Sequence, residues 1–171
     1  MKRIGLTASL VVLLSLSFAL NSSADGPKIV NEHLFGSTPN VTIRGVVAGG
    51  APWVLDGGRV QLDPSGRLKV RGNGLVIAAG ALASGDPVPD GLVGTVATVT
   101  TVHAALTCGG PGGGVPFTIT PTDEVPLSSN GDFKINALIE VPSVCAQPIV
   151  LIRIGAPADE GPWIAASRLP E

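Results

Sequence analysis

Short segments in which apolar and polar residues alternate, separated by glycine and proline, recur along the chain. The clearest pair covers residues 59–62 and 67–70, where Val and Leu alternate with Arg, Gln and Lys. A three-residue loop, Pro64-Ser65-Gly66, places Leu62 opposite Leu68 and keeps the apolar residues of both segments on one face. The last loop residue is a glycine, which adopts the left-handed conformation that such a loop requires. The pattern predicts a β-hairpin.

A second unit further along the chain has the same arrangement. Apolar residues alternate over residues 125–127 and 133–141, on either side of Ser129-Asn130-Gly131. With these three residues as the loop, Leu127 lies opposite Phe133 and a glycine again occupies the left-handed position. We therefore expect a second hairpin with the same turn design.

Other strands are expected where apolar runs lie between helix-breaking residues. The candidates are residues 41–47, residues 93–108 with a bend near residues 98–101, residues 115–120, residues 149–152 and residues 163–167. Residues 149–152 are apolar on both faces, which is typical of a central strand covered on both sides or of a strand at a sheet corner. In the 115–120 strand, the residues predicted to face the core are Val115, Phe117 and Ile119.

The second half of the 93–108 segment alternates with a period of two. The residues predicted to face inward are Val102, Ala104, Leu106 and Cys108, and those predicted to face solvent are Thr101, His103, Ala105 and Thr107. Gly (23 residues) and Pro (15 residues) are spread along the chain, and no helical periodicity follows residue 24. About nine strands are enough for two packed layers, so the fold class is an all-β, antiparallel β-sandwich.

The first 24 residues have the pattern of a secretory signal peptide. Lys2 and Arg3 precede an apolar run over residues 4–20, and Ser22-Ser23-Ala24 supplies small residues for cleavage. The apolar run is short for a membrane span, which needs about 20 residues. We expect a signal peptide at 1–24, a flexible segment at 25–39 and one β-sandwich domain at 40–171. The predicted location is secreted, or in the periplasm or cell envelope.

The two cysteines, Cys108 and Cys145, form a disulfide by default in an exported chain. The alternatives are two free thiols or a pair that binds a metal. The spacing is not Cys-x-x-Cys and no histidine lies beside either residue, so a zinc site is disfavoured.

The charge balance argues against anionic partners. Without Lys2 and Arg3 the chain has nine basic and 13 acidic side chains, a net charge of about −4 with neutral histidines. No basic stripe is visible along the sequence, so nucleic acid and anionic membranes are poor candidates as partners.

Catalytic arrangements are not evident in the sequence. The possible bases are His33, in the expected flexible segment, and His103, on a face expected to be exposed. No Gly-x-Ser-x-Gly elbow occurs. Most carboxylates adjoin glycine or proline, where turn chemistry is the ordinary role, although two of them could form a glycosidase pair. These carboxylates are Asp56, Asp63, Asp86, Asp90, Asp123, Glu124, Asp159 and Glu160.

Ligand sites of other kinds are also disfavoured by the sequence. Asp86–Asp90 lacks the alternating oxygen ligands of a calcium loop. Gly109–Gly114 lacks the following helix and the lysine of a phosphate loop, so we expect it to be a flexible connection between strands. No metal or cofactor is expected.

Trp53 and Trp163 are the candidate ligand-stacking residues. Each follows a proline near the end of a predicted strand. Each indole either stacks on a sugar or fills the end of the core, and the second role is favoured because a sugar platform usually combines several rings.

Several segments together are similar to those of a known kind of protein. They are Ala51–Asp56, Gly66–Val70, Gly74–Ile77, Ala104–Gly110, Val125–Ser128, Asn130–Asp132, Cys145–Ile154 and Trp163–Ala166. They resemble small secreted bacterial proteins of unknown function that have an immunoglobulin-like β-sandwich and a paired Cys. The resemblance covers residues 41 to about 167. It implies the architecture and the compartment, and it assigns no catalytic or binding residue.

The function predicted from the sequence is that of an exported, non-enzymatic β-sandwich module that binds a protein or a surface outside the cytoplasm. A carbohydrate-binding module that uses Trp53 or Trp163 is the first alternative. A small hydrolase with paired carboxylates is the second.

Overall fold

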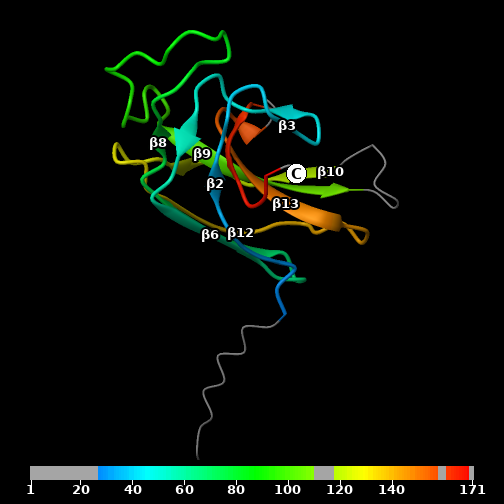
Figure 1. The fold of residues 1–171 in the computed structure, drawn as a ribbon. Helices are drawn as coiled ribbons and strands as arrows, with labels where there is room; N and C mark the ends of the chain where they lie inside the picture. Colours follow the sequence, from blue (N-terminus) through cyan, green and yellow to red (C-terminus); the bar gives the residue numbers. More distant parts are fainter. Residues whose placement is uncertain (1–26, 110–117, 158–160, 170–171) are drawn as a thin grey trace, which may run out of the picture.

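The computed structural model of the chain describes residues 27–109, 118–157 and 161–169. These residues form β-strands and connections, without an α-helix, and build two main antiparallel sheets and two short two-stranded sheets (Figure 1). The fold is therefore all-β. Within the described residues, no helix has the length and apolar character needed to span a membrane. The predicted signal peptide lies outside the described residues.

The four-stranded sheet forms one layer of the sandwich. Its strands are β1 (Val30–His33), β6 (Gly57–Leu62), β7 (Arg67–Asn73) and β12 (Phe133–Leu138), in the order β1-β6-β7-β12. The predicted hairpin is confirmed, because Leu62 pairs with Leu68 across β6 and β7. Gly66 ends the loop with a φ of 84°.

The larger sheet forms the second layer. Its strands are β10 (Thr118–Pro121), β9 (Thr101–Gly109), β13 (Ala146–Arg153), β14 (Trp163–Ala166) and β2 (Phe35–Gly36), in that order, and β11 (Val125–Pro126) pairs with the start of β9. β13 lies between β9 and β14, which confirms the prediction that residues 149–152 belong to a central strand. The predicted strand at 163–167 is β14.

Two short sheets complete the fold. β3 (Thr42–Ile43) pairs with β4 (Val46–Val47), and β5 (Trp53–Val54) pairs with β8 (Val76–Ile77). The prediction of one strand over residues 41–47 is wrong. The chain reverses at Arg44-Gly45, where both residues have positive φ (48° and 81°), as in a two-residue hairpin turn.

The main core lies between the two large sheets. The four-stranded sheet contributes Val30, Val60, Leu62, Leu68, Val70, Phe133 and Ile135, and the larger sheet contributes Val102, Ala104, Leu106, Cys108, Val150, Ile152 and Ile164. These are alternate residues along most of the strands, as expected where two pleated sheets face each other. The predicted inward face of β9 is therefore confirmed.

A second, smaller core covers the other face of the larger sheet. Ile43, Val46 and Ala48 pack there with Leu151, Trp163 and Ala166. His103, Ala105 and Thr107 lie on this covered face and are fully buried. The prediction that they face solvent is wrong, because the β3–β4 hairpin and its flanking residues form a third layer that the alternation of β9 does not reveal.

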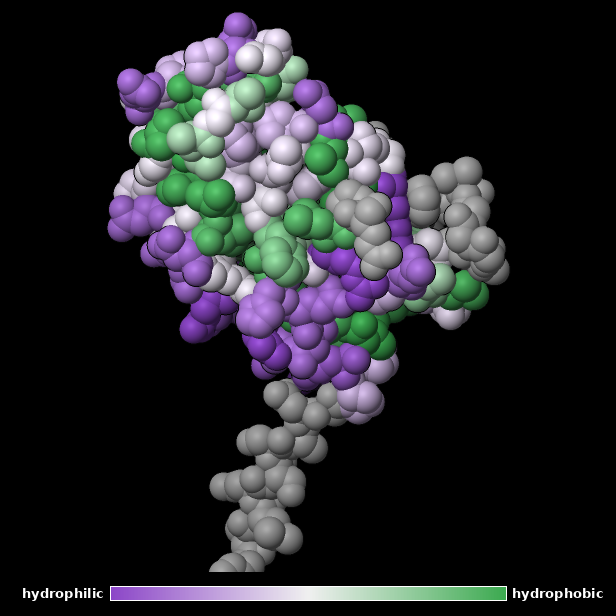
Figure 2. All heavy atoms as spheres, viewed as in Figure 1, coloured by the Kyte–Doolittle hydropathy of each residue, from purple (hydrophilic) through white to green (hydrophobic). Residues whose placement is uncertain are grey.

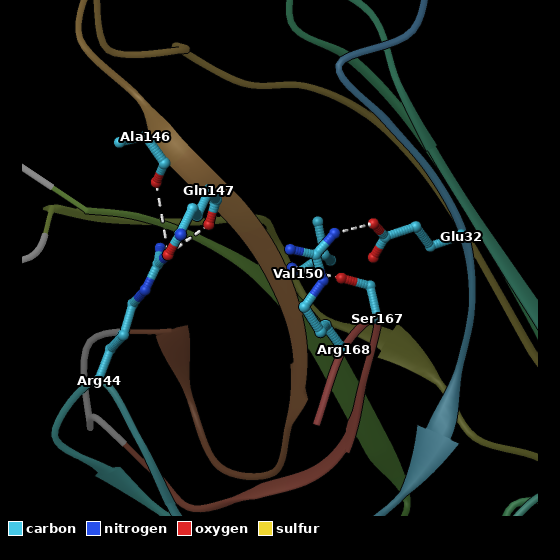
Figure 3. A network of polar contacts seen from close by, with 7 residues as sticks. All are labelled: Glu32, Arg44, Ala146, Gln147, Val150, Ser167 and Arg168. Carbon is cyan, nitrogen blue, oxygen red and sulfur yellow. Dashed lines mark hydrogen bonds and ion pairs between the residues drawn. The ribbon is translucent and has the colours of Figure 1, made fainter. Parts of the chain in front are cut away.

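The expected flexible segment at 25–39 is also ordered in part. β1 pairs with β6, and β2 pairs with β14, so this stretch joins an edge of each large sheet. Glu32 in β1 accepts a hydrogen bond from Arg168 beyond β14, which links the two layers (Figure 3). The sequence here is polar because its strands lie at sheet edges.

The second predicted hairpin is confirmed in its turn and wrong in its strand pairing. Ser128 donates its backbone N–H to Asp132, and Gly131 has a φ of 80°. The two arms then separate, since β11 pairs with β9 and β12 pairs with β7. The turn thus carries the chain from one sheet to the other.

Two further predictions concern β9 and β10. Strand structure begins at Thr101, and residues 93–100 are not strand. Ile119 in β10 is exposed, so its predicted inward position is wrong. Val115 and Phe117 lie outside the described residues, as do residues 110–114 of the predicted glycine-rich connection.

Candidate ligand-binding face

The disulfide predicted from the sequence is present. Cys108 in β9 is joined to Cys145, which lies immediately before β13. The neighbouring residues Gly109 and Ala146 pair in the same sheet. The bond therefore links two adjacent strands of the larger sheet and serves the stability of the fold.

The two tryptophans occupy core positions. Trp53 is 5% exposed and packs in the main core, and Trp163 is fully buried in the smaller core. Burial leaves neither indole a ring face on which a sugar could stack. This arrangement corresponds to the core-filling role, and the candidate stacking site does not form in the structure.

The two histidines are far from forming one site. His33 is exposed on β1, opposite Arg59, whereas His103 is 0% exposed and lies opposite Arg153 in β13. Burial, and then the positive charge of Arg153, lower the pKa of His103. Neither ring nitrogen of His103 makes a hydrogen bond of ordinary geometry, and the nearby backbone of Gly155 opposes the lowering of the pKa only in part. A buried imidazole of this kind has no access to a substrate at the surface.

Several carboxylates make turn contacts. The carboxylate of Asp63 accepts hydrogen bonds from the backbone and hydroxyl of Ser65 and from the backbone of Arg67. The hydrogen bond from the Ser65 hydroxyl is the main reason that the pKa of Asp63 is lowered. Asp86 accepts a hydrogen bond from Ser84 in the same manner. Of the other candidates, Asp159 and Glu160 lie outside the described residues.

No group of three or more His, Cys, Asp and Glu side chains that could hold a metal ion occurs among the described residues. The charged group that does assemble is basic. It lies on the outer face of the four-stranded sheet, opposite the core.

The antiparallel register builds this basic face from alternate residues of three strands. Arg59 in β6 pairs with Arg71 in β7, and Arg71 pairs in turn with Lys134 in β12. These three side chains point to the same face, because paired residues in a sheet share a side. Arg67 and Lys69 precede Arg71 at intervals of two residues along β7 and extend the same surface. We call these five residues the basic face.

Amide side chains form a second row beside the first. Gln61 and Asn136 lie on either side of Lys69, and Asn31 of β1 lies opposite Gln61. The side-chain oxygen of Asn31 accepts hydrogen bonds from Arg59 (2.8 Å from Nη2) and from Gln61 (3.5 Å). The row therefore has hydrogen-bonding groups next to the cations. We call these three residues the amide row.

The surface between these side chains is hollowed. A depression of about 420 Å³ is lined by Arg59, Lys69, Arg71 and Lys134 of the basic face, by Gln61 and Asn136 of the amide row, and by Val70. Hydrophilic residues gather along the side of the molecule where β6 and β12 lie (Figures 1 and 2).

The positive charge of this face meets a carboxylate at one end, where the charge of Arg67 contributes to lowering the pKa of Asp63. None of its five cations forms an ion pair with a carboxylate within the parts of the chain that the structure describes. Asp63 and Asp132 lie at the ends of the strands and accept hydrogen bonds from turn backbone. Five of the nine basic residues beyond residue 24 thus share one sheet face, in a chain whose net charge is negative.

The inference that the chain has no basic stripe is therefore wrong. The five cations are separated along the sequence and become neighbours across strands. The predicted hairpin already placed Arg59, Arg67 and Lys69 opposite the apolar face. The missing information was the pairing of β12 with β7, which adds Lys134.

A second hollow, of about 400 Å³, lies beside the β3–β4 turn and is lined in part by Arg44 and Arg153. Arg44 donates to the backbone carbonyls of Ala146 and Gln147 (Figure 3). It also donates to the backbone carbonyl of Thr107. Its guanidinium thereby attaches the β3–β4 hairpin to β9 and β13. These contacts give Arg44 a structural role.

Comparisons of the chain with protein-family models, with curated proteins and with solved structures found no match.

Proposed function

We propose that this chain is an exported, non-enzymatic binding module with an immunoglobulin-like β-sandwich, and that it binds an anionic surface or polymer through the basic face. The observation that carries the proposal is the row of Arg59, Arg71 and Lys134 on adjacent strands. Clustered cations raise the local concentration of an anionic partner even where the whole protein has a negative charge.

Export is supported by two independent features. Residues 1–24 have the charged, apolar and small-residue regions of a signal peptide. The Cys108–Cys145 bond is consistent with an oxidising compartment outside the cytoplasm. Expression of the full chain in a secreting host should give exported protein whose sequence begins near Asp25. Retention of residues 1–24 in exported protein would contradict this part of the proposal.

The non-enzymatic role is supported by the positions of the groups considered for catalysis. His103 is buried without a hydrogen-bonded nucleophile, and Asp63 and Asp86 bind turn groups. General acid–base catalysis requires a titrating group within hydrogen-bonding reach of a substrate. The basic face, in contrast, is open to solvent and supplies charge without a reactive arrangement.

Ion-exchange chromatography tests the proposed binding face directly. A chain with a negative net charge should pass through a phosphate-bearing cation exchanger at pH 7 unless its cations are clustered. We expect retention of residues 25–171 at low ionic strength, and elution as the added salt shortens the Debye length to about 10 Å at 0.1 M. Passage of the unmodified protein through the column would overturn the proposal.

Two matched double variants test whether the retention on the cation exchanger comes from the basic face. The double variant Arg71→Gln/Lys134→Gln removes two charges from the basic face and should elute at lower salt. Lys28→Gln/Arg168→Gln removes the same charge elsewhere and should elute close to the unmodified protein. Circular dichroism and urea unfolding of each variant show that the fold is retained. Equal elution of both double variants would assign the retention to net charge.

A further inference from the structure

We infer that the ligand of the basic face is a linear acidic polysaccharide, whose sugar units carry carboxylate and hydroxyl groups. This inference rests on the proposed function and specifies its ligand. It depends on three properties of the surface: the spacing of the cations, the adjacent amide row and the residue types that the outward positions hold.

The cations are spaced regularly by the geometry of the sheet. Arg59, Arg71 and Lys134 are paired residues on adjacent strands, and such strands lie about 4.8 Å apart. Arg67 and Lys69 continue along β7 at about 6.7 Å per two residues. A flexible polymer with a charge on each repeating unit can therefore contact several cations at once. Repeated contacts of this kind raise affinity through effective concentration.

The amide row indicates a ligand with hydroxyl groups as well as charges. An amide side chain offers both donors and an acceptor, which is suited to hydroxyls, whereas a phosphate or sulfate oxygen only accepts. Gln61 and Asn136 lie on either side of Lys69, so they adjoin a cation that can bind a carboxylate. A uronic-acid unit presents both kinds of group close together.

The outward residues of the four strands disfavour the other anionic partners. These positions hold no Trp or Phe, and the chain has no Tyr. Single-stranded nucleic acid is commonly bound by stacking its bases on aromatic rings. Membrane association is strengthened by apolar side chains that enter the lipid, and the large apolar residue here is Leu138, at the end of the edge strand β12. The surface matches a hydrated, charged polymer better.

The depression of about 420 Å³ gives the polymer a place to lie across the strands. Its lining includes Arg59, Arg71 and Lys134 from the basic face and Gln61 and Asn136 from the amide row. A sugar unit over Lys69 would thus lie between the two amides, with the row of Arg59, Arg71 and Lys134 beside it.

The test compares four polymers on residues 25–171 by isothermal titration at a fixed ionic strength. The probes are polygalacturonate, inorganic polyphosphate, single-stranded DNA and neutral dextran, with the charged polymers matched in charge concentration. We expect the tightest binding with polygalacturonate, lower affinity for polyphosphate and DNA, and no binding to dextran. Preference for DNA or polyphosphate would overturn the ligand assignment and leave the basic face as the binding site.

Two variants separate the ligand assignment from the proposed function. Gln61→Ala/Asn136→Ala should weaken polygalacturonate binding about tenfold and polyphosphate binding much less, since it removes hydrogen bonds and retains every charge. Arg71→Gln/Lys134→Gln should weaken the binding of both polymers. Equal losses for both polymers in the amide variant would overturn the ligand assignment. If no charged polymer binds the unmodified protein, the proposed function itself is wrong.

Discussion

Arg59 of β6 and Arg71 of β7 lie directly opposite each other in the antiparallel register. Like charges in this relationship destabilise a sheet. Asn31 accepts hydrogen bonds from two nitrogens of the Arg59 guanidinium, at 3.2 Å and 2.8 Å, and so holds one of the two side chains toward β1. Arg71 also has Lys134 opposite it on its other side. Three cations therefore lie in one row on an exposed face, and this is the row that the proposed ligand binding would use.

Substituting Arg71 should raise stability while weakening ligand binding. Arg71→Thr removes the central charge of the row and introduces a β-branched residue that suits a strand. We expect the free energy of unfolding to rise by about 0.5 kcal/mol at low ionic strength, within the range for cross-strand pairs. The gain should shrink as salt screens the repulsion in the unmodified protein. Urea unfolding at two salt concentrations measures both effects.

Lys69→Thr is the matched control for this prediction. Lys69 lies on the same strand and face, but its cross-strand neighbours are Gln61 and Asn136. The change in β propensity is similar, and no directly opposed like charge is removed. An increase in stability as large and as salt-dependent as that of Arg71→Thr would refute the explanation from cross-strand repulsion.

Local turn chemistry explains why part of the fold was predictable. The register of β6 and β7 follows from where the apolar residues must lie and from the glycine that ends the loop. The loop glycine Gly66 also lies close to the backbone of Ile139, because a Cβ at residue 66 would lie 1.9 Å from the carbonyl oxygen of Ile139. The sequence could indicate the turn itself because the left-handed φ of 84° at Gly66 is a requirement of the loop alone, whereas the contact with Ile139 depends on a distant segment.

Long-range pairing explains most of what the sequence did not reveal. The turn at residues 128–132 was predicted, but β11 and β12 continue into different sheets. The β3–β4 hairpin packs on the face of the larger sheet that lies opposite the main core, and His103 is buried on that same face. Alternation of residues along one strand reports which side is apolar. It does not report which distant segment lies on the other side.

The candidate site was only partly predictable for the same reason. Alternation placed Arg59, Arg67 and Lys69 on the polar face of the hairpin, while Lys134 joined them through the pairing of β12 with β7. The tryptophans were the sequence-based candidates for ligand contact, and both are buried. Aromatic content alone does not show whether a ring faces solvent.

Removal of the disulfide should destabilise the protein without changing its fold. The bond closes a loop with a sequence separation of 37 residues. In the chain-entropy description, a loop of this size contributes about 4 kcal/mol, because the bond restricts the unfolded chain. Cys108→Ala/Cys145→Ala should therefore unfold at a markedly lower urea concentration, with a similar circular dichroism spectrum. An unchanged midpoint would show that the bond contributes nothing to stability.

The buried imidazole of His103 should make stability depend on pH below neutrality. Burial and the charge of Arg153 lower its pKa in the folded state, while an unfolded chain has a histidine pKa of about 6.5. Below that pH the unfolded state binds a proton that the native state resists. The free energy of unfolding should therefore fall as the pH is lowered from 6.5 toward 5, by at most about 1.4 kcal/mol per pH unit. Urea titrations across this range measure the slope.

Two histidine variants test whether this slope comes from His103. His103→Leu should flatten it, whereas His33→Gln, at an exposed position of β1, should leave it unchanged. Asp63 also has a lowered pKa, but the stability it contributes is lost at a lower pH, as the pH falls below about 3.9. A slope that persists between pH 6.5 and 5 in His103→Leu would contradict the assignment.

Gly131 should be the turn position least tolerant of a side chain in the second turn unit. Its φ is 80°, and a Cβ there would lie 2.4 Å from both the nitrogen and the oxygen of Leu75. The Leu75 nitrogen donates to the Gly131 carbonyl at 2.9 Å, so the two backbones cannot separate without losing a hydrogen bond. Gly131→Ala should lower the free energy of unfolding by at least about 2 kcal/mol, because left-handed strain and a backbone clash add together.

Gly91→Ala is the control for Gly131→Ala. No atom lies within 4 Å of the added Cβ at residue 91 and its φ is not left-handed, so the free energy of unfolding of this variant should stay within about 1 kcal/mol of that of the unmodified protein. If both variants unfold at the same urea concentration, the close approach of this turn to Leu75 does not constrain residue 131.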